Sequence, residues 1–348
     1  MSPKPLTVAH PKPLRFHILR ILFTIIILKN GMISIAQTFQ WDISLLGFAD
    51  NREYKSHVAN SQTFFGSQFV PSLGVNFDTT HNLWLGASAL NEFGSDQYFS
   101  AITPQIYYHY KGHRFDFQFG SFPKHKLFAS APRALYNDTL EYFRPNMNGL
   151  FWSFKHRYLV QSVYLDWTSR QTDTQRETFI MGWQGFFQYE SVFLYNHIYM
   201  YHVASPAIRI PNDHVRDNGV AFIRLGYDAT SSTPFDSLSF SIAGIQSYER
   251  YRSTKTWHTP MGIIIEAIIQ YKGFGIRNAF YKGNGHNLDW GDPFYRLNQY
   301  NRMDVYFTPL HFQRVTGRFG FSFHFAEGRI SHQQQFSFRV NLNSNGKK

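Results

Sequence analysis

The sequence predicts an all-β fold: a transmembrane, antiparallel, up-and-down β-barrel of about sixteen strands, with fourteen strands as the nearest alternative. Apolar and polar residues alternate along most of the chain from Trp41 onwards. The alternating segments are about ten residues long, which is the length of a strand that crosses a bilayer. Short and long connections follow one another between these segments, as they do in outer-membrane barrels, where the short turns face the periplasm.

The composition is unusual for a water-soluble protein. Aromatic residues make up 18% of the 348 residues and charged residues only 16%, whereas a soluble domain has about 25% charged residues. The mean hydropathy is nonetheless slightly negative, at -0.33, which disfavours a bundle of membrane-spanning helices, because each needs about 20 apolar residues. The chain has no cysteine, so disulfide-stapled scaffolds, thiolate metal sites and cysteine nucleophiles are excluded.

The first 36 residues are typical of a cleaved secretory signal peptide. Basic residues precede a short apolar run at 21–28, and Ser34-Ile35-Ala36 matches the small-x-small pattern before a cleavage site. A membrane anchor is the alternative, but the apolar run is too short to cross a bilayer. We therefore expect a signal peptide over residues 1–36 and a single outer-membrane β-barrel domain over residues 37–348.

The formal net charge of +11 gives only weak support to a nucleic-acid partner. Residues 1–36 contain five basic residues and no acidic one, which leaves 29 basic against 23 acidic residues in the rest of the chain. This smaller excess of six is spread along the sequence, whereas nucleic-acid binding requires a basic patch. We expect no nucleic-acid partner.

Alternation with a period of two is clearest in three segments, 114–119, 318–325 and 335–342. Successive side chains of a strand point to opposite faces, so each segment has one apolar and one polar face. A water-soluble β-sandwich has the same alternation and stays open as an alternative. The length of the segments and the aromatic residues at their ends favour a membrane barrel with aromatic girdles. Only a closed sheet satisfies all backbone hydrogen bonds of strands in lipid.

Several short stretches resemble a known family. They include Leu135-Tyr136-Asn137, Gly291-Asp292-Pro293-Phe294-Tyr295-Arg296, Tyr300-Asn301-Arg302-Met303-Asp304 and Gln333-Gln334-Gln335-Phe336, beside the Ser-Ile-Ala-Gln end of the signal peptide at 34–37. The chain resembles porin-like outer-membrane proteins of Bacteroidota-type bacteria, and these stretches are scattered over most of the mature chain. The resemblance implies a barrel in the outer membrane. None of the stretches is a catalytic signature, so no site residue follows from it.

The polar face of the predicted strands carries many charged residues, and these must face the interior because charges are costly on the lipid face. Sixteen strands enclose an aqueous channel, so the charges are either channel lining or pairs that only solvate the wall. The channel-lining candidates are Asp42, His109, Arg114, Asp116, Lys155, Asp166, Arg224, Glu266, Arg277, Arg302, Asp304, Arg318, His324 and Arg339.

The longest predicted loop, 125–146, is the third of the long loops, and in general porins the third loop folds into the lumen. We expect either a constriction or a plain surface loop. The candidates for a constriction are Arg133, Asp138, Glu141 and Arg144. The loop at 283–300 holds Trp290, Phe294 and Tyr295 beside acidic residues, a combination that either binds sugars or anchors the loop at the rim.

These observations predict an outer-membrane porin for passive diffusion of small hydrophilic solutes, with a mild preference for anions because arginine is frequent on the polar face. We expect no enzymatic activity and no cofactor or metal. The expected partners are outer-membrane lipid, the solutes and, as an option, further copies of the chain. A non-conducting barrel of a secretion or nutrient-import complex stays open as an alternative.

A barrel hydrolase is the other alternative. It requires a Ser/His/Asp set, or an Asp/His pair, near one membrane surface. The sequence has no His-Glu-x-x-His and no Gly-x-Ser-x-Gly motif. The candidates for such a set are His197, His202, Asp213, His214 and His258.

Overall fold

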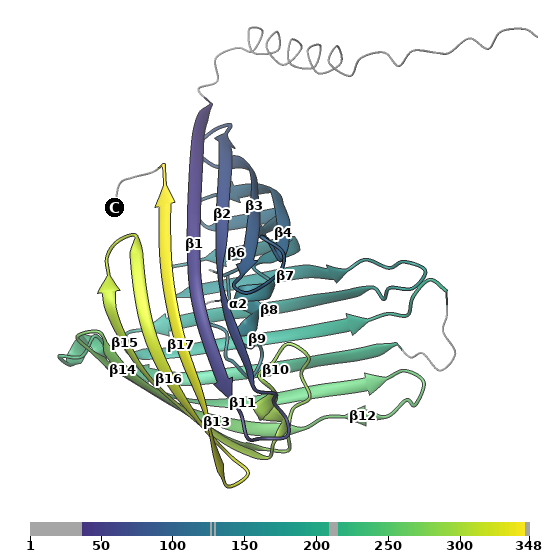
Figure 1. Cartoon of the computed structure of the whole chain (residues 1–348), viewed down its shortest axis with the longest axis vertical. Coiled ribbons are helices and arrows are strands. Elements are labelled where there is room, and N and C mark those ends of the chain that lie inside the picture. The colour runs from purple at the N-terminus through teal and green to yellow at the C-terminus, as the bar shows by residue number, and fades with distance from the viewer. Residues whose placement is uncertain (1–36, 126, 129, 209–214, 345–348) are drawn as a thin grey trace, which may run out of the picture.

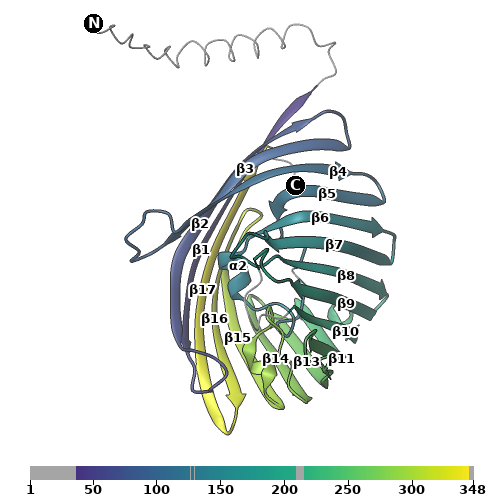
Figure 2. The ribbon, with the colours of Figure 1, turned by 90° about the vertical axis from the view of Figure 1, so that its right-hand side faces the viewer.

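The structure is a computed structural model, and it describes residues 37–125, 127–128, 130–208 and 215–344. Within these ranges, sixteen long strands form one antiparallel sheet that closes on itself (Figures 1 and 2). β1 pairs with β2 on one side and with β17 on the other, with Leu46 opposite Arg339. The predicted sixteen-strand barrel is confirmed. The predicted signal peptide, residues 1–36, lies outside the described residues.

The strands run in order around the barrel, each beside its neighbours in the sequence. A further strand of two residues, β12, pairs only with the end of β11. The strands are β1 (Thr38–Glu53), β2 (Gln62–Asn76), β3 (His81–Glu92), β4 (Ala101–Lys111), β5 (Phe115–Pro123), β6 (Asn146–Lys155), β7 (Leu159–Ser169), β8 (Thr178–Tyr189), β9 (Val192–Val203), β10 (Arg216–Asp228), β11 (Ser237–Tyr251), β12 (Trp257–His258), β13 (Met261–Tyr271), β14 (Phe274–Gly283), β15 (Gln299–His311), β16 (Val315–Ala326) and β17 (Arg329–Asn343).

The alternation in the sequence becomes two faces of one wall. In β13 the side chain of Ile265 is 52% exposed on the outside of the barrel, whereas its neighbour Ile264 is 3% exposed inside it. The same contrast recurs around the barrel, so the outer face forms a broad band of exposed isoleucine, leucine, valine and aromatic side chains. A band of this size is costly in water and is typical of a surface that faces lipid.

The two ends of the barrel differ in their connections. β8 and β9 are joined through Glu190 and Ser191, and β13 and β14 through Lys272 and Gly273. Lys272 and Gly273 both have positive φ angles, 48° and 83°, as a tight two-residue hairpin turn requires. The opposite end carries the connections 124–145, 204–215 and 284–298. β1 begins and β17 ends at the short-turn end, and short turns of outer-membrane barrels face the periplasm.

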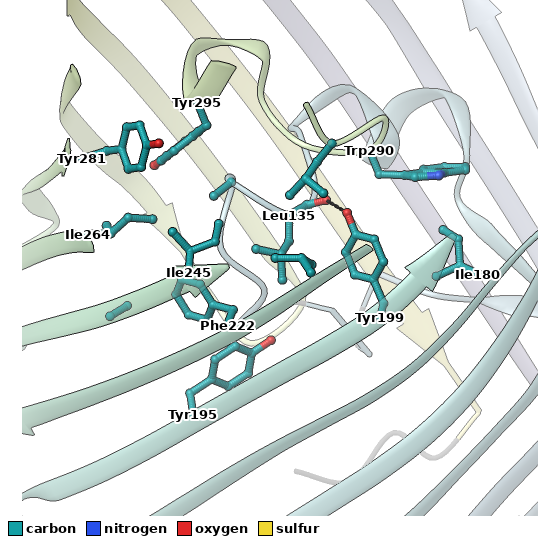
Figure 3. Packing of buried hydrophobic residues seen from close by; sticks show 14 of the residues in the cluster. Leu135, Ile180, Tyr195, Tyr199, Phe222, Ile245, Ile264, Tyr281, Trp290 and Tyr295 are labelled. Atoms are coloured by element: carbon teal, nitrogen blue, oxygen red, sulfur yellow. Dashed lines mark hydrogen bonds between the residues drawn. The ribbon is translucent and has the colours of Figure 1, made fainter. Parts of the chain in front are cut away.

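Two of the long loops, 124–145 and 284–298, fold into the barrel. The first contains the short helix α2 (Thr139–Phe143), and the second contains the 3-10 turn η2 (Pro293–Arg296). Leu135 of the first loop contacts Tyr199 of the wall (Figure 3), and Trp290 of the second packs against Tyr201. The sequence alternation gave no sign of α2, because five residues are too few for a helical apolar stripe. No helix in the described part of the chain is long and apolar enough to cross a membrane.

Candidate functional site

The interior of the barrel holds an ion-pair cluster at the middle of β15. Arg302 Nε donates to Asp304 Oδ1 at 2.7 Å, and Arg133 of the 124–145 loop donates to the other oxygen of Asp304 at 2.9 Å. Asp138 of the same loop accepts from Arg133 at 2.9 Å and from Arg302 at 3.3 Å. Two loop residues and two wall residues therefore form one network that holds the loop inside the barrel.

The charges of this network determine how Asp138 titrates. Burial alone would raise its pKa, but the guanidinium groups of Arg133 and Arg302 outweigh burial and hold the pKa of Asp138 well below its ordinary value. The carboxylate is therefore ionised at any physiological pH, and the loop stays paired with the wall.

Trp290 connects the two inward loops. The guanidinium of Arg144 lies 4.9 Å from the centre of the Trp290 ring, and the ammonium of Lys124 lies 5.6 Å from it. Lys124 Nζ also donates to Asp166 on the wall at 3.3 Å. The aromatic ring and two cations thus join the 284–298 loop to the 124–145 loop and to β7. Trp290 is buried in a contact between loops inside the barrel and not exposed at the rim, and sugar binding by this loop stays a prediction.

The residues expected to line a channel lie on the inner face of the wall, with the exception of Arg114, which is exposed in the turn before β5. Many of them are paired with one another. Asp116 contacts His109 at 3.2 Å and Lys155 at 3.5 Å, and Glu266 contacts Arg277 at 2.6 Å and Arg224 at 3.5 Å.

The other lining and loop candidates also have partners in the interior. Arg339 pairs with Glu141 of α2, and Arg318 lies over the Tyr306 ring. His324 is fully buried and contacts the Tyr300 hydroxyl. Asp42 lies on the inner face near Tyr107. Their role as a channel lining stays a prediction.

The two histidines of β9 lie on opposite faces of the wall, because they are five residues apart. His197 is buried inside, where its two ring nitrogens contact the hydroxyls of Tyr164 at 2.7 Å and Tyr195 at 2.8 Å. Both ring nitrogens of His197 are thus occupied by hydrogen bonds inside the barrel. His202 shares the outward face with exposed Ile198. Asp213 and His214 lie outside the described residues.

His202 forms a pair with an aspartate on the outside of the barrel, at the end that carries the long loops. Its Nδ1 lies 2.7 Å from Asp217 Oδ1 on the neighbouring strand β10. Arg252, which follows β11, donates to the same carboxylate at 2.9 Å. This hydrogen bond raises the pKa of the Arg252 guanidinium. Sequence reasoning included His202 among its candidates but missed Asp217.

The pair belongs to a row of side chains that crosses six strands at one height. Cross-strand pairing places Trp167 opposite Phe179, Phe179 opposite His202 and His202 opposite Asp217. The row continues from Asp217 to Arg250 on β11 and from Arg250 to Trp257 on β12. The row therefore has a His–Asp pair at its centre and aromatic rings at both ends, where the wall meets the outer membrane surface.

A second pair of catalytic residue types lies inside the barrel. Ser247 Oγ contacts His286 Nδ1 at 2.8 Å. Both residues are almost completely buried, and burial lowers the pKa of His286 to about 4. A lipid has no access to this pair, so it is a poor candidate for lipid chemistry. Within the described ranges, no group of three or more His, Asp or Glu side chains is arranged to hold a metal ion.

The fold is similar to those of solved outer-membrane proteins. An anion-selective porin from Comamonas acidovorans matches with a TM-score of 0.55 and 9% identity, over 88% of this chain and 99% of that one. OprD from Pseudomonas aeruginosa matches with a TM-score of 0.55 and 7% identity, over 88% of this chain and 94% of that one. The trimer form of OmpT, an outer membrane protein of Vibrio cholerae, matches with a TM-score of 0.55 and 7% identity, over 88% of this chain and 100% of that one. The likeness at this identity concerns the fold, and it confirms the outer membrane as the location.

No curated protein sequence matches the chain. A family model does, and it matches residues 33–347, about nine-tenths of the sequence. Its description, lipid A 3'-O-deacylase-type, is that of an enzyme activity. The expectation that the chain is not an enzyme is therefore wrong. That expectation was based on the absence of a contiguous catalytic motif, and side chains that meet only across strands leave no such motif in a sequence. The chain belongs to the lipid A 3'-O-deacylase-type family.

Proposed function

We propose that this protein is an outer-membrane ester hydrolase that removes an ester-linked acyl chain from a lipid A-type glycolipid, with His202 as the general base. The observation that carries the proposal is the His202–Asp217 pair on the lipid-facing side of the long-loop rim, with 2.7 Å between Nδ1 and Oδ1. The family description supports the same reaction class.

The chemistry follows from the hydrogen bond between the two side chains. Asp217 accepts the Nδ1 proton of His202, so the other ring nitrogen, Nε2, carries the lone pair that acts as a base. Nε2 takes a proton from a water molecule as the water oxygen attacks the ester carbonyl carbon. The tetrahedral intermediate then collapses, the bond to the sugar oxygen breaks, and His202 returns the proton to that oxygen. The products are a fatty acid and the free sugar hydroxyl.

Water is the nucleophile in this scheme. Among the described residues, no serine or threonine hydroxyl is hydrogen-bonded to His202. Arg252 acts on the base through Asp217: its guanidinium favours the ionised carboxylate, which keeps His202 oriented and stabilises the imidazolium formed during the reaction.

The place of the pair fits a substrate in the outer leaflet. The exposed side chains of Met181, Ile198 and Ile223 lie below it on the same face of β8, β9 and β10. Acyl chains of a lipid in the outer leaflet would lie along these side chains, and the ester groups of the lipid lie at the height of the headgroups. Trp167 and Phe179 stack beside His202, with 5.2 Å between their ring centres.

The test is hydrolysis of purified lipid A in mixed micelles by the refolded chain Gln37–Lys348, with the released fatty acid as readout. We expect His202→Gln and Asp217→Asn to lower kcat by at least about 100-fold, which is the usual contribution of a general base. His156→Gln is the matched control, because His156 is exposed in the short turn at the periplasmic end. Wild-type kcat in a folded His202→Gln barrel would contradict the assignment.

A passive-diffusion channel for small hydrophilic solutes is the second candidate. The likeness of the fold to an anion-selective porin supports it, as do the charged side chains on the inner face. The pairing of these charges and the two inward loops weigh against a wide pore. Single-channel recording of the refolded chain in a planar bilayer decides this point. Stable ohmic steps would support the channel, and their absence from a heat-modifiable, folded barrel would rule it out. Assembly into a homo-oligomer stays a prediction.

A further inference from the structure

We infer that Arg250 binds a phosphate group of the glycolipid headgroup, and that this contact selects phosphorylated over dephosphorylated substrate. The inference rests on the proposed function, because it assigns the charge of that same substrate. Arg250 lies directly opposite Asp217 in the cross-strand row, so it is the next residue after the His–Asp pair along the rim.

Within the described residues, the guanidinium of Arg250 has no counterion. Its Cζ lies 4.8 Å from the centre of the Trp257 ring, and its buried Nε has no hydrogen-bond partner in the described part of the chain. No ion pair with Arg250 occurs among the described residues. The buried Nε is out of reach of a ligand, but the two terminal nitrogens of a guanidinium held by stacking are available for an anion. Their planar arrangement matches two oxygens of a phosphate.

Two described carboxylates are neighbours of Arg250 in the sheet, and neither neutralises it. Glu249, its neighbour along β11, points into the barrel and pairs there with Arg216 at 2.7 Å. Asp217 is on the same outer face, but it accepts hydrogen bonds from His202 and from Arg252. Among the described residues, Arg250 in the row and Arg252 beside it therefore place two guanidinium groups around the one carboxylate of Asp217, which leaves a net positive charge there.

The height of Arg250 on the wall identifies the anion as part of a lipid. β12 brings Trp257, an exposed aromatic residue, onto the end of β11. Tryptophan is typical of the membrane interface, where phosphate groups of lipids lie. Arg252 is more than half exposed beside it, which adds positive charge at the same height. A phosphate bound here would place the lipid with its acyl ester groups toward His202.

The test compares bisphosphorylated lipid A with lipid A from which the phosphates have been removed, in mixed micelles with the refolded chain Gln37–Lys348. The readout is the ratio of kcat/KM for the two lipids. We expect Arg250→Gln to lower this ratio about tenfold, the loss of one charge-assisted contact, and Arg250→Lys to restore part of it. Arg157→Gln is the matched control, because Arg157 lies 4.9 Å from the Tyr158 ring at the opposite rim. An unchanged ratio in folded Arg250→Gln would overturn the inference.

A binding measurement separates this inference from the proposed function. The His202→Gln chain, with and without Arg250→Gln, is titrated with micelles of each lipid, and the affinity is measured without turnover. Preference for the phosphorylated lipid that disappears with Arg250→Gln supports the phosphate site even if the wild-type chain hydrolyses nothing. Hydrolysis of both lipids by the wild type, with no preference in either measurement, would leave the proposed function standing and overturn the phosphate site.

Discussion

At the scale of single residues, the parity of a strand separates two histidines that look equivalent in the sequence. His197 lies inside and contacts two tyrosine hydroxyls, and His202 lies outside and contacts a carboxylate. Their five-residue spacing already implies opposite faces. The identity of the acidic partner does not follow from the sequence, because the pairing of His202 with Asp217 depends on the register between β9 and β10 across a long connection.

Arg252 gives a prediction for the proposed base. Arg252→Gln removes the guanidinium that favours ionised Asp217 but leaves the His202–Asp217 hydrogen bond in place. We expect kcat to fall about tenfold, less than on loss of the base itself, with little change in stability because the Arg252 side chain is 55% exposed. The measurement is kcat for release of fatty acid together with the temperature at which the barrel loses its heat-modifiable mobility. A fall in kcat equal to that of His202→Gln would mean that Arg252 contacts the substrate directly.

The low pKa of Asp138 predicts how the stability of the 124–145 loop depends on pH. The pKa of Asp138 is lower in the folded barrel than in the unfolded chain, where an aspartate has a pKa of about 3.9. The stability that it contributes is therefore fully present above that value and is lost only as the pH falls through the lower folded-state pKa. Limited proteolysis of the 124–145 loop should be equally slow at pH 7 and pH 5 and should accelerate only in strong acid. Acceleration already at pH 5 would contradict the assigned ion pairs.

At the scale of elements, the strands could be predicted from the sequence and the inward loops could not. Alternation over ten residues fixes a strand and its two faces, as in 114–119 and 318–325, which match β5 and β16. The 124–145 loop was expected to enter the lumen only by analogy of position. Its path depends on contacts of Arg133, Asp138 and Arg144 with residues more than a hundred positions away along the chain.

Trp290 gives a prediction for these loops. Trp290→Ala removes the ring between Arg144 and Lys124, so the contact between the two inward loops weakens. We expect single-channel conductance in a planar bilayer to increase over that of the wild type, because the loops then leave part of the lumen open. Trp152→Ala is the control, since Trp152 is exposed on the outer face of β6. Equal conductance for the wild type and Trp290→Ala would mean that other contacts hold the loops.

At the scale of the whole molecule, the barrel separates a lipid-facing band from a polar, ion-paired interior. The aromatic-rich, charge-poor composition already indicated this separation. The composition also suggested a channel, since a sixteen-strand barrel is wide enough for one. An enzymatic activity does not follow from composition, because the few side chains of a site contribute almost nothing to average properties.

Because the outer face contacts lipid and the inner face is polar, an added arginine should impair refolding on the outer face but not on the inner face. Ile265→Arg places a guanidinium on the lipid face near the middle of β13, where it costs about 2–4 kcal/mol. Ser241→Arg places the same group on the inner face of β11, opposite Glu266. We expect refolding into vesicles to be impaired for Ile265→Arg and near normal for Ser241→Arg, measured as the fraction of heat-modifiable chain. Equal refolding of both variants would argue against a membrane-spanning band at this position.

The most direct test of the central claim is the mass of lipid A extracted from outer membranes that contain the wild-type chain or the His202→Gln variant. We predict that lipid A from membranes with the wild type loses the mass of one ester-linked acyl chain, and that lipid A from membranes with a folded His202→Gln barrel keeps its full mass. Full-mass lipid A in both membranes, or the same loss in both, would contradict a hydrolytic site at His202.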